Sequence, residues 1–192
     1  MNILHIDSSI TGDNSISRQL SASTISNIVK ARPDAQVVYR DLVAEPLDHY
    51  QITDKPGNST EGSAFSAAIL SEFLAADTIV IGAPLYNFTI PSQLKAWIDR
   101  IVISGVTFKL GPDGSVGLIG EKRAILLVSR SAVYQPGTSW APHEHAETFL
   151  KAIFGFIGIE PEVIVAEGAA YGPESRAAGI EAAEAAIARI AA

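Results

Sequence analysis

Short apolar runs alternate along the chain with stretches in which apolar residues recur at helical spacing. The apolar runs are rich in β-branched and aromatic side chains, and they predict five strands, at residues 2–7, 36–41, 78–82, 124–129 and 162–166. The run Thr78–Gly82 is apolar on both faces, which is typical of a buried parallel strand.

Helical spacing appears in each interval between these runs. Ile25, Ile28 and Val29 lie on one side of a helix predicted at residues 17–31, and Phe65, Ile69 and Phe73 lie on one side of the next. Further helices are predicted by three sets: Leu94, Ile98, Ile101 and Val102 after Pro91; Phe149, Ile153, Phe156 and Ile157; and Ile180, Ala183, Ile187 and Ile190 after Pro173.

Strand and helix therefore alternate at the spacing of a parallel sheet with right-handed crossovers. Five such strands favour an α/β, flavodoxin-like three-layer sandwich, with a parallel sheet in the order 2-1-3-4-5 and helices on both faces. At 192 residues we expect a single domain spanning residues 1–192.

Two segments depart from this simple alternation. Residues 42–62 form a long polar connection, and residues 106–118 are typical of a hairpin turning at Gly111–Gly114. The pattern leaves three roles open for either segment: a lid, a dimer contact or a cover for a sheet edge.

Composition narrows the range of functions. The net charge of −7 gives no support for binding nucleic acid or a membrane surface, and the absence of cysteine excludes disulfides, thiolate catalysis and cysteine-ligated metals. No apolar run approaches the roughly 20 residues of a spanning helix, and the N-terminus opens as a strand without a basic leader. We therefore expect a cytoplasmic protein.

Histidines give no reason to predict a metal site. His143 and His145 are two residues apart at a predicted helix start, so their imidazoles would point to opposite sides. His5 lies within the first predicted strand, where a core or edge role is expected.

The loop after the first strand, Ser8–Ser17, contains four serines and one threonine and leads into a helix. Hydroxyl groups beside the free N–H groups of a helix N-terminus are suited to binding a phosphate. Simple capping of the helix by Ser15 or Asn14 is the alternative. The loop lacks both Gly-x-x-x-x-Gly-Lys-[Ser/Thr] and Gly-x-Gly-x-x-Gly, which leaves a terminal monophosphate as the candidate ligand.

The loops after the third and fourth strands should lie at the same sheet edge. The first of these contains Tyr86, Asn87 and Phe88, a combination suited to a flat heterocycle, although core packing of the two aromatic rings is the alternative. The second, Ser129–Tyr134, contains small residues whose backbone amides are able to face such a ring, and alone it is a weak signal.

Taken together, these segments resemble the FMN-dependent NADH-azoreductase family of flavodoxin-like quinone reductases. The resemblance spans the chain and is most specific at Pro84–Phe88 with Gln93–Lys95. It implies that FMN phosphate is held by Ser9, Ser15, Ile16 and Ser17, that the isoalloxazine is flanked by Leu85, Tyr86, Asn87 and Phe88, and that its polar edge meets Ser129, Arg130, Ser131 and Ala132. The chain departs from the family pattern where Ser131 and Ala132 replace two glycines and Tyr134 replaces a histidine.

The resemblance also implies a function. NADH or NADPH would reduce the bound FMN, which would then reduce quinones and azo compounds in a ping-pong, two-electron cycle within a homodimer. No dedicated acid or base is evident, so Asn87 is the candidate for electrostatic stabilisation, and Tyr134 and Phe108 are candidates for contacts with the acceptor. The alternatives are a flavodoxin-type electron carrier, which should present a dense acidic docking face, and a scaffold module without flavin.

Overall fold

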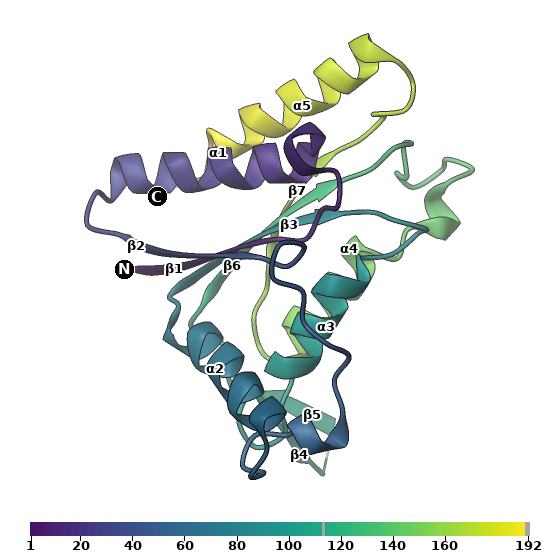
Figure 1. Cartoon of the computed structure of the whole chain (residues 1–192). Coiled ribbons are helices and arrows are strands. Elements are labelled where there is room, and N and C mark those ends of the chain that lie inside the picture. The colour runs from purple at the N-terminus through teal and green to yellow at the C-terminus, as the bar shows by residue number, and fades with distance from the viewer. Residues whose placement is uncertain (113, 191–192) are drawn as a thin grey trace.

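The structure is a computed structural model that describes residues 1–112 and 114–190, and a twisted parallel sheet forms its middle layer (Figure 1). The strands are β1 (Asn2–Asp7), β2 (Gln36–Asp41), β3 (Thr78–Pro84), β6 (Arg123–Ser129) and β7 (Glu162–Ala166). They pair in parallel in the order β2-β1-β3-β6-β7. Counted along the chain without the separate β4–β5 hairpin, this is the predicted order 2-1-3-4-5.

Helices cover both faces of the sheet, as predicted. Figure 1 shows α1 (Ile16–Ala31) and α5 (Pro173–Ile187) on one face and α2 (Glu61–Ala75), α3 (Ser92–Ile101) and α4 (Glu147–Phe156) on the other. Side chains of β3 alternate between the two layers, because successive residues of a strand point to opposite faces. Ile79 and Ile81 pack with the α2, α3 and α4 layer, whereas Val80 packs with the α1 and α5 layer.

Side-chain caps mark the starts of α1 and α2. The Ser15 hydroxyl accepts a hydrogen bond from the Arg18 N–H (3.3 Å) at the start of α1, and Thr60 does the same for α2. The predicted stripe of α2 is buried only in part: Ile69 and Phe73 are fully buried, whereas Phe65, four residues before Ile69, is 45% exposed. In this first part of α2 the buried positions are held by Ser63 and Ser66 instead.

The predicted hairpin is present as β4 (Phe108–Gly111) and β5 (Gly114–Gly117), with its turn residue Asp113 outside the described residues. It packs against the C-terminal half of α4, where the rings of Phe108 and Phe156 are 4.6 Å apart. Gly117 is required at this contact, since a Cβ there would collide with the backbone of Gly158. In Figure 1 the hairpin lies below α3 and α4, away from the sheet.

The long connection is also partly ordered by its own contacts. It contains the 3₁₀ turn η2 (Ile52–Asp54), in which Asp54 is buried and accepts a hydrogen bond from the Gln51 N–H (2.8 Å). Within the described ranges, no helix combines the length and apolar character needed to cross a bilayer.

The sheet brings three chain segments to one edge. Asp7 at the end of β1 pairs with Gly82, and Pro84 at the end of β3 pairs with Ser129 at the end of β6. The loops that follow these three strands therefore emerge side by side, which is the usual position of a ligand site in an open parallel sheet.

Candidate functional site

A cavity of about 590 Å³ lies at this sheet edge, among the three loops. The predicted site residues that line it are Ser9, Ser15, Ile16, Leu85, Tyr86, Asn87, Ser129, Arg130 and Ser131. Lining residues that were not among the predicted site residues are Ile10, Thr11, Asn14, Pro84, Ala169 and Arg176, of which Ile10, Thr11, Asn14 and Pro84 belong to the two loop motifs. The structure thus brings most of the predicted site together and adds a contribution from the last helix.

One end of the cavity is formed by the serine-rich loop. The Ser9 hydroxyl lies 3.0 Å from the Thr11 hydroxyl, and the Ser15 hydroxyl lies 3.1 Å from that of Ser17, which is fully buried. Among the described residues, the N–H groups of Ile16 and Ser17 in the first turn of α1 have no hydrogen-bond partner. Ser15 caps the helix, so the capping alternative explains this residue but leaves both of these donors available to an anion.

The Arg18 side chain fixes this loop by hydrogen bonds. Its guanidinium donates two hydrogen bonds to the Ser9 carbonyl oxygen (3.1 and 2.9 Å) and two to the Asp41 carboxylate (both 2.7 Å). The hydrogen bonds from Arg18 lower the pKa of Asp41 to about 2, and Asp41 in turn raises the pKa of Arg18 further above its ordinary value. Sequence reasoning missed this pair, although a cation in the first turn of a helix opposes the helix dipole and signals a tertiary partner.

Asp7 extends this network into the sheet. Its buried carboxylate accepts hydrogen bonds from Ser21 (2.8 Å) and Tyr39 (3.1 Å), and His5 Nε2 lies 3.5 Å away. Burial and the neighbouring Asp7 raise the pKa of Tyr39 to about 12. Gly82 permits this packing, because a Cβ there would collide with the Asp7 side chain. His5 is therefore a buried strand residue beside Asp7, as expected, but it is not fully satisfied, because its Nε2 has no hydrogen-bond partner among the described residues.

The other end of the cavity is formed by a tight turn after β3. The backbone N–H groups of Tyr86 and Thr89 each donate to the carbonyl of the other residue (2.8 and 3.0 Å). The two central residues, Asn87 and Phe88, have positive φ values of 46° and 74°. A β-carbon-bearing bulky residue in this region is strained by about 1–3 kcal/mol. Such strain marks the turn as a functional element.

Core packing does not explain the aromatic residues of this turn. Phe88 is 41% exposed and packs its ring 4.9 Å from that of His143. Tyr86 lines the cavity, and its hydroxyl lies 2.9 Å from the Ser9 hydroxyl. Tyr86 thereby connects the two ends of the cavity.

The third loop accommodates Ser131 and Ala132, which stand where the family pattern has two glycines, with ordinary backbone geometry. Neither Ser131 nor Ala132 has a positive φ, so their Cβ atoms are accommodated without backbone strain. Ser131 lines the cavity, whereas Ala132 is buried behind it.

Arg130 lines the cavity, but its guanidinium forms ion pairs with carboxylates outside it. Its guanidinium pairs with Glu147, with Glu167 (2.8 Å) and with Glu144 (3.4 Å). Burial alone would raise the pKa of Glu147, but hydrogen bonds from Lys151 and Arg130 outweigh it and lower that pKa. The Arg130 side chain thus ties the loop to α4.

The two predicted acceptor contacts lie outside this cavity. Tyr134 is buried in a neighbouring cavity, with its ring 6.0 Å from that of Trp140, and Phe108 packs on α4 in the hairpin. Trp140 and His143 follow, 6.1 Å apart, and His143 contacts Phe88. A row of rings therefore leads from Tyr134 to the strained turn, and sequence reasoning missed Trp140, which is 41% exposed.

The histidine pair is not on one helix, so that part of the sequence argument was wrong. His143 ends the 3₁₀ turn η3 (Ala141–His143), and Glu144 separates it from His145 ahead of α4. In the part of the chain that the structure describes, no group of three or more histidine, aspartate or glutamate side chains is placed to hold a metal ion.

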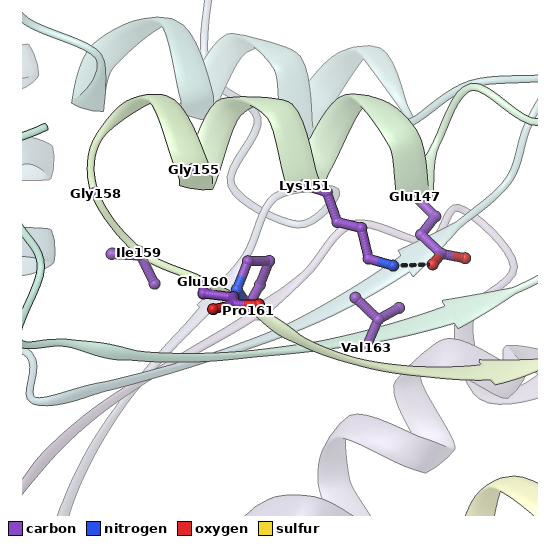
Figure 2. A pocket seen from close by; sticks show the side chains of 8 residues that line it. All are labelled: Glu147, Lys151, Gly155, Gly158, Ile159, Glu160, Pro161 and Val163. Carbon is purple, nitrogen blue, oxygen red and sulfur yellow. Dashed lines mark hydrogen bonds and ion pairs between the residues drawn. The ribbon is translucent and has the colours of Figure 1, made fainter. Parts of the chain in front are cut away.

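A larger cavity, of about 680 Å³, lies between α4 and the start of β7 (Figure 2). Figure 2 shows its two charged helix residues, Glu147 and Lys151, paired with each other at 2.6 Å. Its remaining lining includes Ile159, Glu160, Pro161 and Val163. Glu147 is the first residue of α4, so the helix start in this cavity already carries a carboxylate, which disfavours an anionic ligand there. The cavity at the strand ends is therefore the stronger candidate.

Comparisons with known proteins agree with this fold. Residues 1–191 match the family model described as the flavodoxin-like fold. An FMN-dependent NADH:quinone oxidoreductase from Methylorubrum populi is 50% identical over 186 residues, covering 92% of each chain. One from Gluconacetobacter diazotrophicus is 49% identical over 99% of each chain.

Solved structures give the same result. An azoreductase from Bacillus anthracis superposes with a TM-score of 0.86 at 31% identity, covering 99% of this chain and 100% of that one. An FMN-dependent NADH-azoreductase from the same species, in complex with FMN, superposes with a TM-score of 0.85 at 25% identity over the whole of both chains. As the sequence motifs predict, the chain belongs to the flavodoxin-like family of FMN-dependent NADH-azoreductases and quinone reductases.

Proposed function

We propose that this protein is an FMN-dependent oxidoreductase that takes electrons from NADH and passes them in pairs to quinones and azo compounds. One observation carries the proposal. A single cavity extends from Ile16, whose N–H group at the start of α1 has no partner among the described residues, to Asn87 in the strained turn. Ser17 and Phe88 adjoin these two residues but do not line the cavity. The helix start suits a terminal phosphate and the turn a flat ring, and the names of the relatives specify FMN.

The residues present fit this cofactor. The N–H groups of Ile16 and Ser17, with the hydroxyls of Ser9, Ser15 and Ser17, would hold the phosphate. Leu85, Tyr86, Asn87 and Phe88 would flank the ring, and Ser129, Arg130, Ser131 and Ala132 would adjoin its polar edge. When bound, FMN supplies the acceptance and donation of hydride.

The protein's part in the reaction is binding, orientation and electrostatics. No carboxylate or histidine is among the described residues that line the cavity. Asn87 and the backbone amides beside it are the neutral donors placed to stabilise negative charge on the ring, without a titrating acid or base. Protons for the reduced acceptor would therefore come from water.

The same lining argues against a flavodoxin-type electron carrier, which should surround its flavin with carboxylates. We also propose a homodimer in the cytoplasm, with acceptor contacts from Tyr134 and Phe108 made where two subunits meet.

Two substitutions at Ile16 test the phosphate site. Ile16 is the first helical residue after the Ser15 cap, a position where proline is well tolerated, so Ile16→Pro removes one N–H donor and preserves the helix. Ile16→Ala is the matched control, because it removes the same buried side chain and keeps the N–H. We expect FMN affinity to fall about tenfold or more in Ile16→Pro relative to Ile16→Ala, as for loss of a charge-assisted hydrogen bond. Equal affinities would contradict the phosphate site.

The reaction is tested by spectroscopy. The purified protein should bind FMN and turn yellow, NADH should bleach it under anaerobic conditions, and a quinone should restore the colour. Bleaching by a protein reductant but not by NADH or NADPH would support the carrier, and failure to bind FMN would refute the proposal.

A further inference from the structure

Arg176 is the one lining residue of the cavity that comes from the last helix. It lies in the first turn of α5, and its Nη2 donates a hydrogen bond to the Asn14 carbonyl oxygen (3.1 Å). Asn14 immediately precedes Ser15, the cap of α1. The guanidinium is therefore held at the phosphate end of the cavity, across from the free N–H groups of α1.

The local backbone fixes this position. Gly172 has a φ of 109° and Pro173 follows it, which starts the helix abruptly. The Ser175 hydroxyl donates to the Gly168 carbonyl (2.8 Å), which ties the helix start to the loop after β7. As with Arg18, a cation in the first turn of a helix opposes the helix dipole, so its placement calls for an external reason.

Arg176 differs from the neighbouring arginines in its ion pairing. The other arginines at this end are neutralised, Arg18 by Asp41 and Arg130 by three glutamates. Among the described residues, no carboxylate lies within ion-pairing distance of Arg176. Only one of its five side-chain N–H groups is used, in the bond to Asn14. The cavity thus contains one positive charge without a partner.

We propose that Arg176 neutralises the terminal phosphate and makes the site selective for a phosphorylated flavin over its uncharged nucleoside form. This inference rests on the proposed FMN site. A phosphate monoester carries close to two negative charges at neutral pH, more than neutral hydroxyl and amide donors offset. An arginine fork beside it supplies charge and two further donors without moving the Asn14 contact.

The alternative is a purely structural role, in which Arg176 only ties α5 to the loop before α1. The two roles differ in what they recognise. A structural tie would shape the cavity for every flavin alike, whereas charge recognition acts on FMN alone and weakens as salt rises.

The test compares FMN with riboflavin as probes. Arg176→Gln keeps an N–H₂ group for the Asn14 carbonyl and removes the charge, whereas Arg176→Lys keeps the charge. Arg189→Gln is the control, because Arg189 lies on the exposed turn just after α5. Dissociation constants are measured by quenching of flavin fluorescence, at low and at high salt.

We expect Arg176→Gln to weaken FMN binding about 10–30-fold, as for loss of a charged hydrogen-bond partner, and to leave riboflavin binding within about twofold. Arg176→Lys should recover part of the loss, and Arg189→Gln should bind like the wild type. The salt dependence of FMN binding should be shallower in Arg176→Gln than in the wild type, a readout that requires no riboflavin binding.

Equal weakening of FMN and riboflavin, or an unchanged salt dependence, would overturn the inference and favour the structural tie. A wild-type protein that binds no FMN would instead refute the proposed function itself. The two failures are therefore distinguishable.

Discussion

The two ends of the cavity are built by different means. At the phosphate end, side chains fix one another: Arg18 holds the Ser9 carbonyl and Asp41, and the serine hydroxyls pair. At the ring end, the backbone itself is held in an unusual conformation, with Asn87 and Phe88 both at positive φ. The first end is preorganised by hydrogen bonds and the second by strain.

This difference follows from what each end would bind. A phosphate needs donors at fixed points, which a cross-linked loop supplies. A flat ring needs exposed apolar surface and free amides, which a strained turn presents because its residues cannot fold back into the core. The two ends should therefore respond in opposite ways to substitution. Removing hydrogen bonds at the first end should lower the free energy of unfolding, whereas relieving backbone strain at the second end should raise it.

Arg18→Met should have the largest effect. It removes both bonds to the Ser9 carbonyl and leaves Asp41 and the buried Asp7 without their cation. We expect the free energy of unfolding to fall by about 2–4 kcal/mol, as for a broken, partly buried ion pair, and FMN affinity to fall about 10–100-fold. Urea titration and FMN binding at low temperature measure the two effects.

Arg18→Lys serves as the control, because an ammonium group cannot bind both partners as a fork does. It should recover stability more than FMN affinity. Full recovery of FMN affinity by lysine would mean that charge, and not the position of the Ser9 loop, matters at this end.

The same pair predicts a pH dependence. The folded-state pKa of Asp41 is about 2, below its ordinary 3.8, so its stabilisation is fully present above about pH 4 and is lost as the pH falls toward 2. The difference in unfolding free energy between wild type and Asp41→Asn should be constant, at about 1–2 kcal/mol, from pH 5 to 8. It should shrink as the pH falls from about 4 through about 2, and a difference that is undiminished at pH 2 would contradict the role of this carboxylate.

Phe88→Gly probes the ring end. Asn-Gly is the favoured pair for a turn with two positive φ values, so glycine relieves strain and should raise the free energy of unfolding by about 1 kcal/mol. The loss of the ring that contacts His143 should lower kcat/KM for a quinone about tenfold, a cost typical of a removed aromatic contact. Thermal unfolding and steady-state kinetics measure the two effects.

Asn87→Gly is the matched variant, since asparagine already tolerates this conformation. It should change stability by only a few tenths of a kcal/mol, because the steric penalty that glycine removes is small at asparagine. A Phe88→Gly variant that is less stable than the wild type would show that packing of the ring outweighs the strain.

The fold was predictable because its signals are local. Apolar runs such as Thr78–Gly82 and helical stripes such as Leu94 and Ile98 fix the type of each element, and their alternation fixes the sheet order. The exposure of Phe65 was not predictable, because spacing alone cannot say which turns of a helix lie over the sheet.

The site was predictable where it depends on loop composition and not where it depends on distant partners. Ser9, Ser15 and Tyr86 stand out within their own loops. Arg176 is about 160 residues from Asn14 in sequence, and a helix and a strand lie between Arg18 and Asp41. Only the fold brings the members of each pair together. The ion pairs of Arg130 with Glu144, Glu147 and Glu167 were not predictable for the same reason.

The smallest effect is expected at Ser131 and Ala132, which stand where the family pattern has two glycines. Both have ordinary negative φ values, so glycine here relieves no strain and mainly enlarges the conformational entropy of the unfolded chain. Each of Ser131→Gly and Ala132→Gly should lower the free energy of unfolding by about 0.5–1 kcal/mol and change FMN affinity less than about threefold. This is the opposite sign to Phe88→Gly, although all three positions belong to the proposed flavin site. A variant that gained stability, or bound FMN tenfold more tightly, would show that strain or crowding extends to the third loop and is not confined to the turn after β3.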